Sequence, residues 1–180
     1  MSRLLEKYKK QILPQLKSEL GISNDLAVPR LEKIVVNLGI GRLIQQNPKN
    51  LELLKEATRK ITGQQATMRL AKKAIAGFKI RQNQVVGIAT TLRGKRMYDF
   101  FDKFINVVMP RTRDFRGLSK KGFDGRGNYS CGLREQIAFP EMSEESVDFT
   151  FGIEVTIVTT ADSDEAAYQL LKKFGFPFST

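Results

Sequence analysis

The chain has 180 residues, of which 41% are hydrophobic and 27% charged, so it can bury a core and does not have the composition of a disordered segment. Its 30 lysines and arginines exceed its 19 aspartates and glutamates, and the net charge of +11 indicates a polyanionic partner. Histidine, the commonest acid–base residue, is absent, and the single cysteine, Cys131, excludes an internal disulfide and indicates a reducing compartment.

The chain begins with a predicted helix over residues 3–20. Its first residues, MSRLLEKYKK, mix charged and apolar side chains, so they are not a signal peptide, and no apolar run reaches the roughly 20 residues of a membrane span. We therefore expect a cytoplasmic protein without a membrane partner. The apolar residues recur at helical spacing, Gly21 caps the helix, and Pro14 predicts a kink within it.

A strand over residues 31–40 comes next, with apolar residues alternating with small and polar ones. A second helix is predicted from its cap at Asn47, with Pro48 at its first position, to Gly63 just past its end. Its inner stripe is Leu51, Leu54, Thr58 and Ile61. Two strands over residues 64–71 and 85–93 follow. Their predicted inner residues are Gln64, Ala66, Met68, Leu70, Val86, Ile88, Thr90 and Leu92.

Gly94 breaks that strand, and a third helix is predicted over residues 95–108, ended by Pro110. Residues 110–130 hold four glycines and no apolar period, which predicts a long functional loop that is mobile until a partner binds. Strands over 131–139 and 149–160 and a last helix over 163–174 complete the chain. This helix has Asp164 and Glu165 in its first turn, Lys172 and Lys173 in its last, and Gly175 as its stop, so its charges match the helix dipole. The order predicts a single α+β domain over residues 1–180. It has a largely antiparallel five-stranded sheet, helices mostly on one face, and an open face for RNA docking.

No acidic residue occurs between Glu56 and Asp99, although ten basic residues do. Because like charges repel in a folded region, this window favours an anionic partner over an ordinary solvated face. Residues 141–180 carry 8 acidic and 2 basic side chains instead, so the two ends of the chain differ in charge. The ten bases are Arg59, Lys60, Arg69, Lys72, Lys73, Lys79, Arg81, Arg93, Lys95 and Arg96.

The face of the first three strands opposite their apolar residues collects small and polar side chains. Such a face can simply meet solvent, as in many antiparallel sheets. It can also dock a sugar–phosphate backbone, because small residues allow close approach while amides and hydroxyls bond phosphates and 2′-hydroxyls. The overlap with the basic window favours docking, and the lack of paired aromatics favours recognition of RNA shape over base stacking. The residues are Lys33, Asn37, Gly39, Gln65, Thr67, Arg69, Gly87, Thr91 and Arg93.

The hairpin between the strands predicted over 64–71 and 85–93 carries a second basic group, AKKAIAGFKIR at residues 71–81. Phe78 within it has two possible roles, which the sequence leaves open. The ring can stack on a base or ribose, or it can anchor the connection to its own domain.

Five segments together resemble one family: KIVVNLGIG (33–41), KKAIAGFKIR (72–81), TLRGKRMYDFF (91–101), PRTRDFRGLSKKGFDGRGNYS (110–130) and FPEM (139–142). In this order, over nearly the whole chain, they are similar to the bacterial large-subunit ribosomal protein five family. The resemblance implies a structural constituent of the large subunit, without cofactor or metal. It would bind 5S rRNA in the central protuberance and contact 23S rRNA and neighbouring proteins there. Asn83 and Val85 stand where relatives often have Gly and Pro, and Thr90 where they often have Val.

The resemblance also implies which residues make each contact. The 5S rRNA surface would comprise Lys33, Asn37, Gly39, Gly41, Arg42, Gln65, Thr67, Arg69, Thr91 and Arg93. The P-site tRNA would be contacted by Lys72, Lys73, Gly77, Phe78, Lys79 and Arg81. The small-subunit head protein thirteen would meet Arg111, Arg113, Asp114 and Arg116 in an intersubunit bridge.

The main alternative is an enzyme acting on nucleic acid, which the sequence disfavours. GIGR (39–42) and GRGN (125–128) match neither the Walker A motif nor the GxGxxG motif, and each is interpreted as a turn. The basic window lacks the clustered carboxylates of a two-metal nuclease, and we expect Asp114 and Asp124 to pair with arginines. A free-standing RNA chaperone or translation regulator stays open. Copurification with large subunits after a high-salt wash would distinguish it from a ribosomal constituent.

Overall fold

The structure, a computed structural model, describes residues 2–142 and 149–179. It confirms the predicted α+β class with an open, largely antiparallel five-stranded sheet in the order β2-β3-β1-β5-β4. The helices are α1 (Arg3–Lys7), α2 (Leu13–Leu20), α3 (Gly41–Gln46), α4 (Asn50–Thr62), α5 (Gly94–Lys103), α6 (Met109–Arg111) and α7 (Asp164–Phe174), with π-helical turns at Tyr8–Ile12 and Phe104–Val108. The strands are β1 (Leu31–Gly39), β2 (Thr67–Leu70), β3 (Val85–Leu92), β4 (Tyr129–Leu133) and β5 (Ile153–Thr159).

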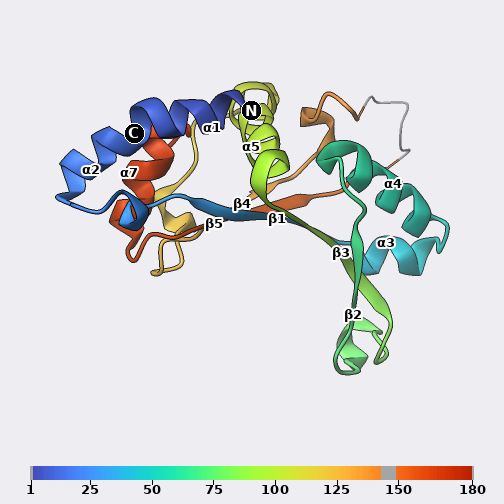
Figure 1. Cartoon of the computed structure of the whole chain (residues 1–180). Coiled ribbons are helices and arrows are strands. Elements are labelled where there is room, and N and C mark those ends of the chain that lie inside the picture. The colour runs from blue at the N-terminus through green and yellow to red at the C-terminus, as the bar shows by residue number, and fades with distance from the viewer. Residues whose placement is uncertain (1, 143–148, 180) are drawn as a thin grey trace. The chain divides into compact units, whose positions relative to one another are not determined.

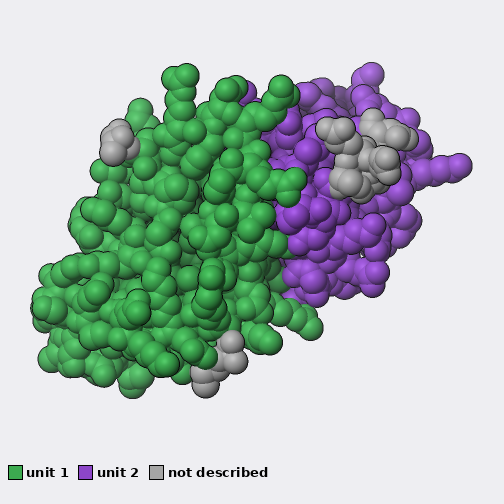
Figure 2. All heavy atoms as spheres, turned by 90° about the horizontal axis from the view of Figure 1, so that it is seen from above, with its two compact units in different colours: residues 1–34, 92–131, 156–180 green, residues 35–91, 132–155 purple. Residues whose placement is uncertain are grey.

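The chain divides into two compact units, which Figure 2 shows in separate colours. Unit 1 comprises Met1–Ile34, Leu92–Cys131 and Thr156–Thr180, and unit 2 comprises Val35–Thr91 and Gly132–Val155. Neither unit is one continuous stretch of sequence, and strands β1, β3, β4 and β5 each contribute residues to both. No single point of the chain therefore separates the two units.

Unit 1 is built on packed helices. Contacts join α1 to α5 and α2 to α7, and Figure 1 shows α2 beside α7. Aromatic rings fill the core: the Phe101 and Phe174 rings meet edge to face with centroids 5.5 Å apart. The Tyr8 hydroxyl donates to the Pro29 carbonyl at 3.0 Å. Burial raises the pKa of Tyr98 to about 12, so this phenol stays protonated in the core at neutral pH.

Both prolines that lie within the helical runs of unit 1 follow a π-helical turn. Before Pro14, Leu13 N donates to Tyr8 O, and before Pro110, Met109 N donates to Phe104 O, so each bond spans five residues instead of four. A proline lacks the N–H group and clashes with the carbonyl four residues earlier, and the wider turn accommodates it. The predicted end of the third helix at Pro110 is therefore wrong, because helix α6 continues to Arg111.

The segment predicted as a long functional loop, residues 110–130, is anchored in unit 1. Leu118 N donates to Pro177 O at 2.8 Å, and Ser179 N donates to Leu118 O at 2.9 Å. A Cβ atom on Gly122 would lie 2.5 Å from Ser130 O, so this glycine allows two segments to touch. The structure shows close packing in this segment, and its mobility before a partner binds stays a prediction.

Unit 2 contains β2, most of β3, the end of β1, and helices α3 and α4. Figure 1 shows α4 beside β3, with the β2–β3 hairpin extending away from that helix. Gly63 ends α4 at φ +67°, as predicted, but α4 begins at Asn50. The reason is that the Asn47 side chain accepts from Lys49 N and forms a turn, preceded by the unpredicted helix α3. The predicted turn GIGR is thus corrected: its last two residues begin α3.

The predicted second strand, residues 64–71, is the least accurate element. Only Thr67–Leu70 form β2, and the predicted inner residues Met68 and Leu70 are 45% and 52% exposed. Alternation along a strand shows that its two faces differ, but it does not show whether another layer covers either face. The strands predicted over 131–139 and 149–160 are likewise shorter, at Tyr129–Leu133 and Ile153–Thr159. The last helix, α7, has Ser163 as its cap and Gly175 as its end, as its charges and glycine predicted.

Candidate nucleic-acid interface

Three strands of unit 2 bring Asn37, Gly87 and Arg69 together on one face. Arg69 is paired with Gly87 in the β2–β3 ladder, and directly opposite residues lie on the same face. A Cβ atom on Gly87 would lie 3.7 Å from Arg69 Cβ and 3.9 Å from Asn37 Oδ1. We call the surface formed by Asn37, Gly39, Thr67, Arg69 and Gly87 the open face. Thr67 belongs to it because it pairs with Ala89, the residue two after Gly87.

The open face has the small residues predicted from the sequence, but its two glycines differ. Gly39 is exposed with open space where a side chain would be, so a bulky group can approach the backbone of β1 there. Gly87 is buried, and a Cβ atom on it would lie 3.1 Å from Leu38 O. Gly39 therefore leaves room for a ligand, whereas Gly87 lets β1 and β3 lie close together.

The other residues predicted for this surface lie near it in sequence but in different settings. Gly41 and Arg42 begin α3, and Gln65 is exposed just before β2. Thr91 is half-buried, and its carbonyl accepts from Gln64 Nε2 at 3.1 Å. Lys33 and Arg93 belong to unit 1, where Arg93 is exposed and immediately precedes α5.

Glu154 is the residue of this surface that the sequence reasoning missed. It is exposed on β5, and its Oε2 atom accepts a hydrogen bond from Asn37 Nδ2 at 3.0 Å. The alternation on β5 could have located it, because Ile153, Val155 and Ile157 are buried while Glu154 lies on the other side of the strand. A carboxylate thus lies on a surface that was predicted to collect small, polar and basic residues.

One arginine of the basic window is compensated within its own helix. Arg59 forms an ion pair with Glu56 at 2.9 Å, and the hydrogen bond from Arg59 lowers the pKa of that carboxyl. The other bases of unit 2 in this window lie mostly after α4. Arg69, Lys72, Lys73, Lys79 and Arg81 are all exposed on or beside the β2–β3 hairpin.

The connection at residues 71–81 combines these bases with exposed apolar side chains. Ile75 and Ile80 pair as an isolated bridge, and a 3-10 turn at Ala76–Phe78 separates them. The ring of Phe78 is 64% exposed, so it does not anchor the connection in the core. The backbone of the connection is instead attached to α3, because the exposed Gln45 side chain donates to the carbonyls of Phe78 and Lys79 at 3.3 and 3.4 Å.

The turn that closes this hairpin uses Asn83 at φ +64°. Asparagine tolerates the left-handed region better than most residues, although glycine does so more easily. Asn83 N donates to Ala71 O at 2.9 Å, which joins the two ends of the connection. Asn83 therefore adopts a conformation that a glycine would also adopt at this turn.

The four residues predicted for the intersubunit bridge are exposed in unit 1. Arg111 ends α6, and Arg113, Asp114 and Arg116 follow it, with Asp114 at φ +52°. The structure places them along one short segment that ends where Leu118 is bound to the C-terminal residues.

The GRGN segment is not a phosphate cradle. Gly125 N and Gly127 N donate to the Asp164 carboxylate at 3.0 and 2.8 Å, and Arg126 N and Asn128 N donate to Asp124 at 2.9 and 3.1 Å. Carboxylates of the chain itself therefore occupy these amides. The predicted arginine pairing of Asp124 is wrong. Its partners are amides, and the hydrogen bond from the Asn128 side chain, with that from Arg126 N, lowers its pKa.

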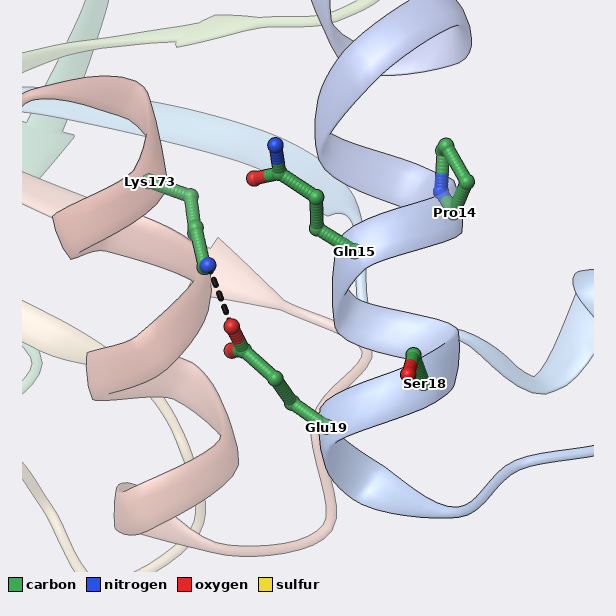
Figure 3. Close-up of a pocket in the computed structure, with 5 residues that line it drawn as sticks. All are labelled: Pro14, Gln15, Ser18, Glu19 and Lys173. Carbon is green, nitrogen blue, oxygen red and sulfur yellow. Dashed lines mark hydrogen bonds and ion pairs between the residues drawn. The ribbon is translucent and has the colours of Figure 1, made fainter.

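Unit 1 has an open hollow on its surface. Figure 3 shows it between α2 and α7, lined by Pro14, Gln15, Ser18, Glu19 and Lys173, with an ion pair between the last two. Among residues 2–142 and 149–179, no group of three or more His, Cys, Asp or Glu side chains could hold a metal ion. Within the same residues no helix is both long and apolar enough to span a membrane.

Comparison with known proteins identifies the family. The family model for ribosomal protein L5 matches residues 24–81, and that for the ribosomal L5P family C-terminus matches residues 85–178. The chain is 51% identical to the large ribosomal subunit protein uL5 of Carboxydothermus hydrogenoformans and to that of Natranaerobius thermophilus, over 99% of each chain. It is also 51% identical to uL5 of Geobacter sulfurreducens over 178 residues.

These matches make the chain a ribosomal protein, which is a structural component and not an enzyme. It belongs to the ribosomal protein L5 family of the large subunit, as the sequence segments predicted.

Proposed function

We propose that this protein is a constituent of the large ribosomal subunit in the bacterial cytoplasm that binds 5S rRNA and helps attach it in the central protuberance. The observation that carries the proposal is the open face, where Asn37, Gly87 and Arg69 meet beside the exposed backbone of Gly39. Amide, hydroxyl and guanidinium groups on a surface with little side-chain bulk suit a sugar–phosphate backbone.

The 5S rRNA surface extends from the open face along the chain. Arg69 and Arg93 supply charge, and Thr67 and Gln65 supply hydrogen bonds that do not depend on base sequence. The full set proposed is Lys33, Asn37, Gly39, Gly41, Arg42, Gln65, Thr67, Arg69, Thr91 and Arg93. Without aromatic pairs for base stacking, this surface reads the shape and backbone of the RNA.

A second contact is proposed between the hairpin connection and the P-site tRNA. The exposed Phe78 ring beside Gly77 can lie against a base or a ribose, and the surrounding bases neutralise phosphates. These bases are Lys72, Lys73, Lys79 and Arg81.

A third contact is proposed with the small-subunit head protein thirteen. One segment exposes four charged residues, Arg111, Arg113, Asp114 and Arg116. Their charges suit a polar contact that forms and breaks as the two ribosomal subunits join and separate. 23S rRNA and the other proteins of the central protuberance complete the proposed set of partners.

Binding of a 5S rRNA transcript by variants of the full chain tests the main proposal. Arg69→Ala and Arg93→Ala should each weaken binding by about tenfold, the loss expected for a charged hydrogen bond to RNA. Lys60→Ala is the matched control, because Lys60 is an exposed base of the same window that lies on α4. Unchanged affinity in both arginine variants would place the RNA surface elsewhere. Absence of the protein from large subunits after a high-salt wash would favour a regulator outside the ribosome.

A further inference from the structure

The hydrogen bond between Asn37 and Glu154 determines how the Asn37 amide is oriented. A carboxylate only accepts hydrogen bonds, so the Asn37 side chain must direct its NH₂ group toward Glu154, at 3.0 Å. The amide oxygen, Oδ1, then faces the other way, toward β3, where it lies 3.9 Å from the position of a Cβ atom on Gly87. The open face therefore presents a hydrogen-bond acceptor in a fixed direction.

A fixed acceptor selects a donor on the ligand. The phosphate oxygens of a nucleic acid backbone only accept hydrogen bonds, and the 2′-hydroxyl is the one backbone group of RNA that donates. The negative charge of Glu154 also disfavours a phosphate next to Asn37, while Arg69 on the neighbouring side favours one. The arrangement thus separates a place for a phosphate, at Arg69, from a place for a ribose, at Asn37.

We propose that Glu154 is a positioning residue for RNA recognition, which holds the Asn37 amide so that its Oδ1 atom accepts a hydrogen bond from an RNA 2′-hydroxyl. This inference rests on the proposed binding of 5S rRNA through the open face. It assigns a role to an acid inside a basic surface, where charge alone would disfavour one.

The test measures binding of two kinds of 5S rRNA transcript by the full chain. One transcript is unmodified, and in the other kind one nucleotide type at a time carries 2′-fluorine, which cannot donate a hydrogen bond. The wild-type protein should bind one of the four fluorinated transcripts about fivefold more weakly than the unmodified RNA, the effect of a lost hydrogen bond. Glu154→Ala and Asn37→Ala should bind unmodified RNA about fivefold more weakly than the wild-type protein does. They should no longer distinguish unmodified RNA from that fluorinated transcript.

A double variant and a charge control isolate the mechanism. If Glu154 acts through Asn37, the Glu154→Ala change should have no further effect in the Asn37→Ala background. Glu154→Gln removes the charge and lets both amides flip, so it should also reduce discrimination between unmodified and fluorinated RNA. This variant replaces Glu154→Ala in the test if Glu154→Ala fails to fold. Glu52→Gln is the control, because it removes one acid on α4, where Glu52 pairs with Lys55. The slope of log affinity against log salt should stay the same in the Glu154 and Asn37 variants, since no phosphate contact is lost.

The outcomes separate this inference from the proposed function. If the wild-type protein does not bind unmodified 5S rRNA, the proposed function is wrong. If it binds, but Glu154→Ala keeps wild-type affinity and discrimination, the positioning role is wrong. Tighter binding by Glu154→Gln than by Glu52→Gln would also overturn it, because Glu154 would then only repel RNA.

Discussion

At the scale of single residues, the side chain of Thr90 is a source of instability in the core. Thr90 is 2% exposed on β3, and among the described residues its hydroxyl has no hydrogen-bond partner. An unsatisfied buried hydroxyl costs free energy that an apolar group of the same shape does not. Thr90→Val should therefore raise the free energy of unfolding by about 1 kcal/mol and the Tm by about 3 °C.

Thr58→Val is the matched control for this change. Thr58 is also buried, but its hydroxyl donates to Leu54 O at 2.7 Å. The same substitution there should not stabilise the protein, because it removes a satisfied group. Thermal unfolding of both variants checks the comparison, and equal effects of the two changes would contradict it.

Asp124 gives unit 1 a stability that depends on pH. Its pKa is below the ordinary value in the folded protein, so the unfolded chain binds more protons between the two values. The stabilisation is present above the unfolded pKa and is lost as the pH falls through the folded pKa. Asp124→Asn should lower the Tm by about 2 °C at pH 7 and by less at pH 3.

Asp99→Asn serves as the control for Asp124, because Asp99 is an exposed acid on α5 in the same unit. Thermal unfolding at several pH values would measure the Tm of both variants. A difference between Asp124→Asn and wild type that stays constant from pH 7 to pH 3 would exclude the proposed linkage.

At the scale of elements, Gly122 allows two segments of unit 1 to lie close together. A Cβ atom on Gly122 would meet Ser130 O at 2.5 Å and the Tyr129 ring at 2.8 Å. Gly122→Ala should therefore destabilise the protein by about 2 kcal/mol, as overpacking does in cores. At Gly132, on β4, the space beside the backbone is open, so Gly132→Ala should have little effect. Equal unfolding midpoints for the two variants would show that the segment yields without strain.

The hairpin connection and the open face are expected to serve different RNAs. Changing Lys72, Lys73 and Lys79 together to Ala should leave 5S rRNA affinity within about twofold, because none of these lysines lies on the open face. The same variant should weaken P-site tRNA binding to reconstituted ribosomes by about tenfold or more. Filter binding and ribosome binding measure the two affinities. A larger loss of 5S rRNA affinity than of tRNA affinity in this variant would show that the connection belongs to the 5S rRNA surface.

The sequence predicted most elements and the family, because periodicity and the helix-ending glycines at 21, 63 and 175 are local signals. It could not predict that Met68 and Leu70 are exposed, since that depends on whether a helix reaches the end of the hairpin. Pro110 misled in a similar way, because a π-helical turn lets the helix continue past it. Glu154 was missed because the acid is distant in sequence from the basic window that marked the surface.

At the scale of the whole molecule, charge separates along the chain. Residues 1–140 carry 28 basic and 11 acidic side chains, whereas residues 141–180 carry 2 basic and 8 acidic ones. If about five phosphates are neutralised on a helical RNA, log affinity should fall against log salt with a slope of about −4 to −5. Titration of a 5S rRNA transcript between low and moderate salt measures the slope. A nearly flat response would rule out a phosphate-dominated interface.

The attachment of Leu118 to Pro177 and Ser179 also bears on the order of folding. Its hydrogen-bond partners lie some sixty positions later in the chain, beyond β5 and α7. Contacts between such distant segments form slowly, because a long stretch of chain must first lose its freedom. Amide protons of Leu118 and Ser179 should therefore gain protection late during refolding, after those of the α7 backbone.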